Sequence, residues 1–304
     1  MNIEYIAMIV HSIIQSTSPI LLVALGSAIC SQVGIFNIAL EAQMLIGCFA
    51  SIAVNYFTGN VILSIIAGVL AGMLVGTVVA LLQVKCKAAD MVVGTALNIL
   101  IAGLTSFILY KIFNIRGTLK DDRLVPMLRV NIPGIEKVPF LGTVLSGLTI
   151  LDYLCFVIAV IIFIWLYKTV NGYHCQAVGI NKEGAESLGT KGTSLQMKIV
   201  ILSGALCGLG GVCLAMGNVT LFAENMTSGR GFMAMAAASM GMNHPITVIF
   251  TSLFFGACQG FGVVLQSVVK SQLTNAIPYI GTIVAMVISS ARKIRKRENG
   301  NNEI

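Results

Sequence analysis

The sequence predicts an all-α, polytopic membrane helix bundle with about eight or nine spans, one of them broken or re-entrant. Of its 304 residues, 57% are hydrophobic and only 10% are charged, whereas soluble domains carry about 25% charged residues. Uncharged runs of 36, 43 and 39 residues follow Glu4, Glu41 and Arg230. Because a spanning helix needs ~20 apolar residues, each run holds one or two spans. This composition excludes a soluble enzyme, a disordered chain and a nucleic-acid module.

The apolar runs place nine candidate spans along residues 1–291, which we expect to form a single transmembrane domain. Turn-type sequences at 59–60 and 243–245 separate neighbouring spans. The segment 231–243 is too short for a full span, so a partial or re-entrant helix is expected there. The expected spans are 5–28, 34–57, 61–83, 91–110, 152–168, 199–218, 231–243, 245–268 and 272–291.

The basic tail 292–304 sets the expected orientation. Five of the 19 basic residues lie at 292–297, directly after the last apolar run, which indicates a cytoplasmic anchor. Counting crossings back from the tail places loop 169–198 inside and loop 111–137 outside. The outer loop holds six basic and three acidic residues, against the positive-inside rule, but its prolines and acidic pair favour a folded outer loop. The N-terminus lacks the features of a cleavable signal peptide.

Small residues recur every four positions in several spans, which is typical of closely packed membrane helices rather than of a gate. The eight cysteines form no C-x-x-C pair, so we interpret them as small hydrophobic residues rather than as disulfides or metal ligands. The spaced glycines are Gly68, Gly72 and Gly76, then Gly204 and Gly208, then Gly256 and Gly260.

The sequence carries no recognisable catalytic or metal centre. The stretch 189–192 lacks the spacing of a nucleotide-binding loop, and the three histidines are scattered without an H-E-x-x-H motif. No catalytic residue and no metal ligand are therefore assigned. Energy for any transport must come from an ion gradient or from another subunit.

Glu41 is the most informative polar residue. Apart from His11, it is the one Asp, Glu, Lys, Arg or His side chain between Tyr5 and Val84, and an intramembrane carboxylate must face a cavity or find a partner. Asn37 is expected to cap a helix that holds Glu41 in its first turns, where the helix dipole favours negative charge. Two hypotheses follow: a broken helix lining a translocation path, or a structural contact between helices.

Three further polar groups are candidates for function. Asn181 is expected to cap a short helix that holds Glu183 and ends at Gly189; this helix either docks on a soluble partner or merely connects two spans. Around Arg230, Gly229 and Gly231 predict a tight turn, with Arg230 as a helix-end anchor or as part of an outer rim that includes Glu224. The remaining candidates for a polar cavity are Gln43, Asn98 and Gln259.

Several segments together resemble a known family. Residues 34–47 resemble the "G-x-x-N-I-G-x-E-G-x-M-L-I-G" stretch of permeases in the branched-chain amino acid/ribose/nucleoside class of ABC importers. Residues 177–189 resemble the cytoplasmic "A-V-G-x-N-x-x-A-A-x-x-x-G" loop of that class. Residues 203–211 and 229–232 are similar to its "S-G-x-x-A-G-L-G-G" and "G-x-G-F" segments. The 85–140 region is most similar to the nucleoside/simple-sugar branch.

The resemblance implies a permease domain over 1–291 in the cytoplasmic membrane of a bacterium. It implies three partners: an ATP-binding cassette subunit, a second permease, and a substrate-binding lipoprotein or periplasmic protein. The second permease is expected to be a related chain, with a copy of this chain as the alternative. It places the coupling to the ATPase on Gly179, Asn181, Glu183, Ala185 and Gly189. No cofactor is expected on this chain, because ATP and magnesium would bind the partner. This chain departs from the family at Gln176, Ala42 and Thr190.

The main hypothesis is therefore an importer permease for nucleosides, since Asn37, Asn98 and Gln259 suit an uncharged solute. Simple sugars and then branched-chain amino acids are the alternative substrates. A gradient-driven secondary transporter that uses Glu41 as its ion site is the rival from another class. An integral-membrane enzyme has no nucleophile–base pair or metal constellation to support it.

Overall fold

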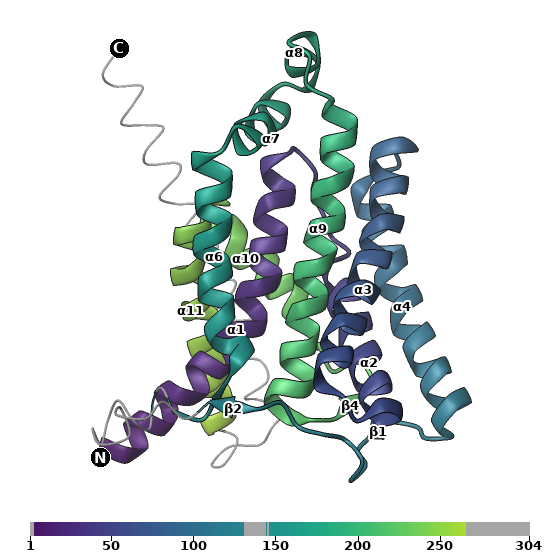
Figure 1. Cartoon of the computed structure of the whole chain (residues 1–304), viewed down its shortest axis with the longest axis vertical. Helices are drawn as coiled ribbons and strands as arrows, with labels where there is room; N and C mark the ends of the chain where they lie inside the picture. The colour runs from purple at the N-terminus through teal and green to yellow at the C-terminus, as the bar shows by residue number, and fades with distance from the viewer. Residues whose placement is uncertain (1–2, 131–143, 145, 266–304) are drawn as a thin grey trace.

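The computed structural model describes residues 3–130, 144 and 146–265 as a helical bundle with short strands at one end (Figure 1). The helices are α1 (Ile3–Gln32), α2 (Leu40–Thr58), α3 (Val61–Ala80), η1 (Leu81–Lys85), α4 (Asp90–Phe113), α6 (Ile150–Lys168), α7 (Val170–Ile180), α8 (Lys182–Ser187), α9 (Gly192–Val212), η2 (Cys213–Val219), α10 (Arg230–Met240) and α11 (Pro245–Leu265). The strands are β1 (Thr118–Leu119), β2 (Arg129–Val130), β3 (Leu148–Thr149) and β4 (Phe222–Ala223).

Within the described residues, seven helical segments are long and apolar enough to cross a membrane. They match seven of the expected spans, although several begin or end elsewhere. The candidate 231–243 corresponds to α10, which has 11 residues and is about 16 Å long at 1.5 Å per residue. The candidate 272–291 and the basic tail lie outside the described residues.

Helices α1 and α9 form the centre of the bundle, with 78% of the residues in their spanning windows buried, against 33% in those of α3, α4 and α6. Pro19 lies inside α1 and has no N–H to donate to the carbonyl of Gln15. Asn218 Nδ2 donates to that carbonyl at 3.3 Å. The break in the α1 hydrogen-bond ladder is thus satisfied by a side chain from η2, as an apolar surrounding requires.

The spaced glycines pack α3 directly against α9. A Cβ on Gly72 would overlap the carbonyl oxygen of Gly204 and would lie 2.7 Å from the Cα of Gly208. A Cβ on Gly208 would lie 2.5 Å from the carbonyl oxygen of Gly68. The expectation of close helix packing is confirmed here, because the two backbones meet where no side chain fits.

The strands tie loops together at the end of the bundle where α1 begins (Figure 1). Strand β1 pairs with β4 antiparallel, with Thr118 opposite Ala223, and β2 pairs with β3. Glu224 Oε1 accepts from the amide of Gly117 at 2.9 Å. Within its described residues, the expected outer loop is therefore ordered by contacts with the loop after η2.

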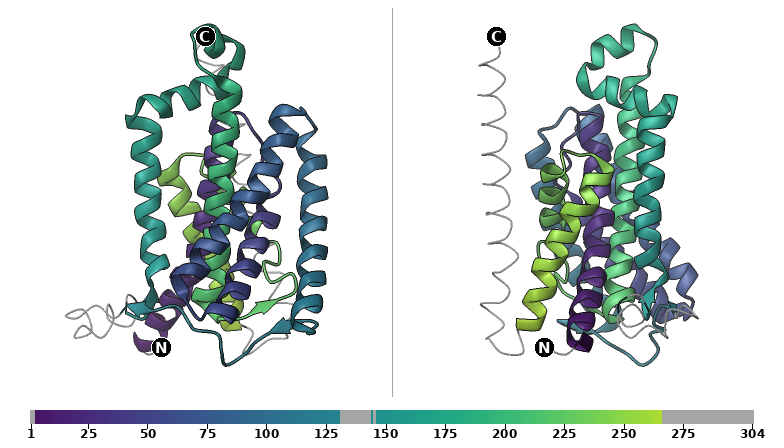
Figure 2. Two further views of the ribbon diagram at one scale, coloured as in Figure 1. Left: turned by 45° about the vertical axis from the view of Figure 1, so that its right-hand side comes forward. Right: turned by 90° about the vertical axis from the view of Figure 1, so that its left-hand side faces the viewer.

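At the opposite end, α7 and α8 project beyond the rest of the bundle (Figure 2). The loop expected at 169–198 thus contains two helices, of which only the second was predicted. Helix α9 also begins at Gly192, seven residues before the expected start at 199. Helix α7 and the first turns of α9 are not predicted from the sequence because this segment is polar and lacks the apolar run of a span.

The α3–α9 crossing provides a matched test of packing. Gly72→Ala should lower the apparent melting temperature of the purified chain, because the added methyl group has no room, and overpacking costs ~1–3 kcal/mol. Gly103→Ala is the control, since no atom lies within 4 Å of its Cβ position. Thermal unfolding in detergent measures both variants, and equal melting temperatures would contradict the packing account.

Candidate functional site

An irregular segment, residues 33–39, separates α1 from α2 inside the bundle. Figure 1 shows α2 starting part-way along the bundle rather than at its end. Four of the residues in this segment, Val33, Asn37, Ile38 and Ala39, are at least 92% buried. Because backbone groups outside a helix have no partners of their own in an apolar interior, this segment needs side chains to satisfy it.

Asn98 of α4 supplies two of those contacts. Its Nδ2 donates to the carbonyl of Ile38 at 3.1 Å, and its Oδ1 accepts from the amide of Ala42 at 2.9 Å. The amide group of Asn98 therefore bridges the end of the irregular segment and the first turn of α2. Its position explains why a polar residue lies in an otherwise apolar span.

The expectation that Asn37 caps α2 is wrong. The helix begins at Leu40, and its N-cap position is Ala39, with no side-chain cap. Asn37 Oδ1 instead accepts from the amide of Ala39 at 3.0 Å, and its Nδ2 donates to Gln43 Oε1 at 3.2 Å. Asn37 thus forms a local turn with the backbone two residues further on, and α2 begins directly after this turn.

Glu41 lies in the first turn of α2 and binds the beginning of α10. Its Oε1 accepts from the amide of Gly229 at 2.8 Å, and its Oε2 accepts from the amide of Gly231 at 2.6 Å. Glu41 is 8% exposed. The carboxylate therefore lies at the N-termini of two helices, where both helix dipoles favour a negative charge.

The two glycines are required by the geometry of this contact. Gly229 has a φ of 78°, in the left-handed region that favours glycine. A Cβ on Gly231 would lie 2.6 Å from the amide nitrogen of Glu41. The predicted tight turn around Arg230 is thus present, and we call the contact of Glu41 with Gly229 and Gly231 the polar junction.

From the polar junction the two helices run toward opposite ends of the bundle. Helix α2 leads to Asn55, whose side chain exchanges hydrogen bonds with the backbone of Val125 near the strands. Helix α10 leads to Asn243, whose carbonyl accepts from Gln32 at the end of α1. The N-termini of α2 and α10 therefore meet inside the bundle, as in the discontinuous helices of transporters.

Arg230 extends the polar junction toward α11. Its Nη1 donates to the carbonyl of Met226 at 2.8 Å. With the amide of Gln259 oriented so that its oxygen faces the guanidinium, this oxygen accepts from Nε at 2.8 Å and from Nη2 at 2.9 Å. Both side chains are half-buried, so this is the more accessible part of the polar contacts. Glu224, by contrast, lies at the strand end of the bundle.

At the other end, the expected short helix is α8. Asn181 Oδ1 accepts from the amide of Gly184 at 2.9 Å, which confirms the predicted cap, and Gly189 ends the helix with a φ of 88°. Glu183 is exposed, whereas Ala185 is 5% exposed and packs inward. Ala185 therefore supports the helix and does not belong to its outer surface.

Gln196, which the sequence analysis missed, connects α8 with the irregular segment. Lys182 Nζ donates to Gln196 Oε1 at 2.9 Å, and Gln196 Nε2 donates to the carbonyl of Val33 at 3.0 Å. Nearby, Gly179 of α7 packs on the backbone of Gln32 and Gly34, where a Cβ on residue 179 would overlap the carbonyl oxygen of Gln32. Gln196 precedes the span expected at 199–218, so no apolar pattern points to it. The one general signal for such a residue is that buried irregular backbone needs hydrogen-bond partners.

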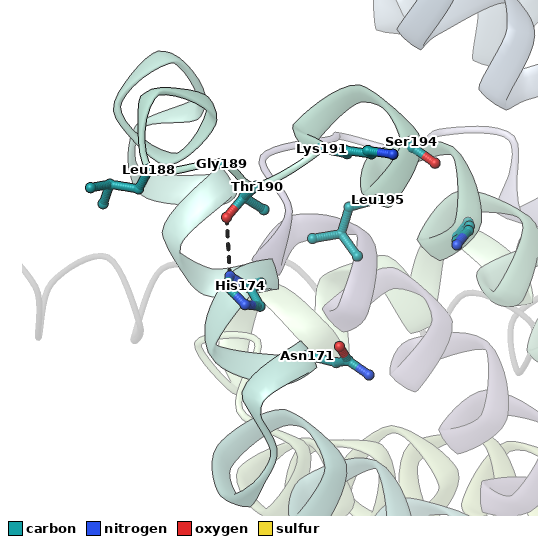
Figure 3. Close-up of a pocket in the computed structure, with 9 residues that line it drawn as sticks. Asn171, His174, Leu188, Gly189, Thr190, Lys191, Ser194 and Leu195 are labelled. Atoms are coloured by element: carbon teal, nitrogen blue, oxygen red, sulfur yellow. Dashed lines mark hydrogen bonds between the residues drawn. The ribbon is translucent and has the colours of Figure 1, made fainter.

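A pocket of about 380 Å³ lies beside α8, between α7 and the beginning of α9 (Figure 3). His174 Nδ1 and Thr190 Oγ1 lie 3.1 Å apart at one side of it. On the buried side of α7, burial raises the pKa of the Cys175 thiol to about 11, which leaves almost no reactive thiolate.

Within the described part of the chain, no group of three or more His, Cys, Asp or Glu side chains could hold a metal ion. Seven helices in this part are long and apolar enough to span a membrane, and one of them, α2, meets the short helix α10 at a buried polar junction. This arrangement indicates a multi-pass membrane protein. The family model for the permease component of branched-chain amino acid transport systems matches residues 9–288. The chain belongs to this family.

Named relatives cover nearly the whole chain. The guanosine ABC transporter permease protein NupQ of Bacillus subtilis is 30% identical over 98% of this chain and 97% of its own length. The nucleoside ABC transporter permease protein NupC of Lactococcus lactis is 30% identical over 99% and 98%. The putative glucose ABC transporter permease protein TsgC13 of Haloferax volcanii is 26% identical over 93% and 85%. No solved structure matches the chain significantly.

Substitution of Glu41 tests the polar junction. In Glu41→Gln one oxygen still accepts an amide, but the new NH₂ group faces the other amide. In Glu41→Leu both amides lose their acceptor, at ~1–3 kcal/mol for each buried unsatisfied group. The melting temperature should therefore fall in Glu41→Gln and fall further in Glu41→Leu. The exposed Glu183→Gln, also in the first turn of a helix, is the control and should change little; an equal response of all three variants would contradict the account.

Proposed function

We propose that this chain is a membrane-spanning subunit of an ATP-driven importer that moves nucleosides inward from an external binding protein. The observation that carries the proposal is the 30% identity with NupQ and NupC along almost the full length of all three chains. Family membership favours this class over the gradient-driven carrier. Simple sugars are the second candidate substrates, supported by the similarity to TsgC13.

The proposed complex has four kinds of subunit. ATP and magnesium bind an ATP-binding subunit, so this chain needs no cofactor and hydrolyses nothing itself. A lipoprotein or periplasmic protein delivers the solute. A second permease, related to this chain rather than identical with it, completes the pathway; the resemblance to paired permeases supports this choice.

We place the complex in the cytoplasmic membrane of a bacterium, with α7 and α8 on the cytoplasmic side. In this orientation the strands and the beginning of α1 lie outside. Helix α10 acts as a re-entrant half-helix, and residues 272–291 add one further span, so the single domain 1–291 has eight spans plus this half-helix. The tail 292–304 then lies inside, in agreement with its basic cluster.

Among the polar candidates, we divide the roles by exposure and by hydrogen bonding. Asn37, Glu41 and Gln43 are at least 92% buried, and both ends of the Asn98 amide are occupied, so these residues hold the polar junction in place. Gln259 and Arg230 are half-buried and lie at the surface of α10 and α11. Because an arginine inside the bilayer faces protein or water rather than lipid, we propose that their face borders the solute path.

Helix α8 is the proposed contact with the ATP-binding subunit. Two apolar side chains beside it, Ile180 and Leu188, are 87% and 89% exposed, at an end that projects beyond the bundle (Figure 2). Exposed apolar groups of this kind mark interaction sites. The hydrogen bonds from Lys182 through Gln196 to Val33 then connect the docked helix with the irregular segment and the polar junction.

The proposal is tested by uptake into proteoliposomes that contain the full complex. We expect nucleoside accumulation to depend on ATP and to persist when an uncoupler removes ion gradients. Ile180→Glu combined with Leu188→Glu should leave the melting temperature unchanged, because both side chains are exposed, but should reduce uptake by about tenfold or more through loss of apolar contact. Gly103→Ala serves as a control outside this surface.

Two results would contradict the proposal. Uptake that ignores ATP but follows a pH gradient, and that is lost in Glu41→Gln, would identify an ion-coupled carrier. Full ATP-driven uptake in the Ile180/Leu188 double variant would remove α8 as the contact with the ATPase.

A further inference from the structure

The pocket beside α8 is formed by two helix faces. On one side it is lined by Ser194, Leu195 and Lys198 of α9 and by Lys191, the residue just before this helix. Ser194 and Leu195 precede Lys198 by four and three residues, which places these three on one side of the helix. On α7, Asn171 and His174 line the opposite wall. Figure 3 shows Leu195 between the α7 wall and the beginning of α9.

The charged residues that line the pocket are all basic. Lys191 and Lys198 are both exposed, and none of the lining residues is acidic. The carboxylate of Glu186 in α8 accepts from Thr193, whose Oγ1 lies 3.5 Å from Oε1. Thr193 is not among the lining residues. The pocket thus combines two ammonium groups with an apolar side chain.

The position of the pocket favours a protein occupant. Its edge includes Leu188 and Gly189, so it is continuous with the surface around α8. Lys191 precedes Lys198 by seven residues, which is ~10 Å along a helix axis. Two cations at that spacing suit an acidic peptide segment better than a single phosphate headgroup. The basic tail 292–297 of this chain is excluded by like charge.

We propose that this pocket receives an acidic segment of the ATP-binding subunit, with carboxylates against Lys191 and Lys198 and an apolar side chain against Leu195. The inference rests on the proposed function and adds to it a second contact, beside α8, with a defined charge. Electrostatic complementarity of this kind determines which partner binds and how fast.

The test uses the ATP-binding subunit that co-purifies with this chain. Its affinity for the permease complex is measured in nanodiscs of zwitterionic lipid. Lys191→Glu combined with Lys198→Glu should weaken binding by about tenfold or more, and the Lys→Gln pair should weaken it less. The matched control is Lys85→Glu with Lys87→Glu. Both of these lysines are exposed at the same end of the bundle, so the net charge changes equally, and binding should stay close to that of the wild type.

Each other outcome overturns the inference. Wild-type affinity in both pocket variants would show that nothing acidic binds there, and an equal loss in the control would indicate general surface charge. A loss that occurs only in nanodiscs of anionic lipid would assign the pocket to lipid headgroups. Failure of the wild-type permease to bind any ATP-binding subunit would instead refute the proposed function, which separates the two failures.

Discussion

The Glu41 carboxylate is the constraint on which the rest of the structure depends. It accepts amides from Gly229 and Gly231 at the start of α10 while it lies in the first turn of α2. Without this acceptor, the N-termini of two helices would face each other inside the bundle with unpaired amides and like dipole ends. The sequence pairs the carboxylate with glycines that let the two backbones meet. The breaks in both helices follow from that contact.

The breaks also connect distant parts of the molecule. The irregular segment before α2 is held by Asn98 of α4 and by Gln196 of α9. Gln196 in turn binds Lys182 of α8. A displacement of α8 therefore acts on backbone that leads directly to Glu41. In the proposed complex, a rigid-body movement of α8 reaches the centre of the bundle through these few hydrogen bonds.

Sequence reasoning predicted the parts of this structure that have a simple physical signal. Long uncharged runs predicted seven of the described spans, and Asn181 with Gly189 predicted α8. Glu41 can be identified from the sequence because a carboxylate in an apolar run needs a partner. That partner is the backbone amide of Gly231, 190 residues away, and no local sequence pattern indicates it. The true start of α2, helix α7 and the role of Gln196 were missed for the same reason: tertiary contacts rather than local pattern determine them.

The central claim, that hydrogen bonds from α8 to the irregular segment carry the movement, is tested most directly by Gln196→Glu. This variant keeps an acceptor for Lys182 but cannot donate to Val33 when ionised. Nucleoside uptake and ATP hydrolysis are measured together in the same proteoliposomes. The account predicts that hydrolysis continues while the solute moved per ATP falls several-fold. An unchanged ratio, in a variant whose complex assembles normally, would contradict it.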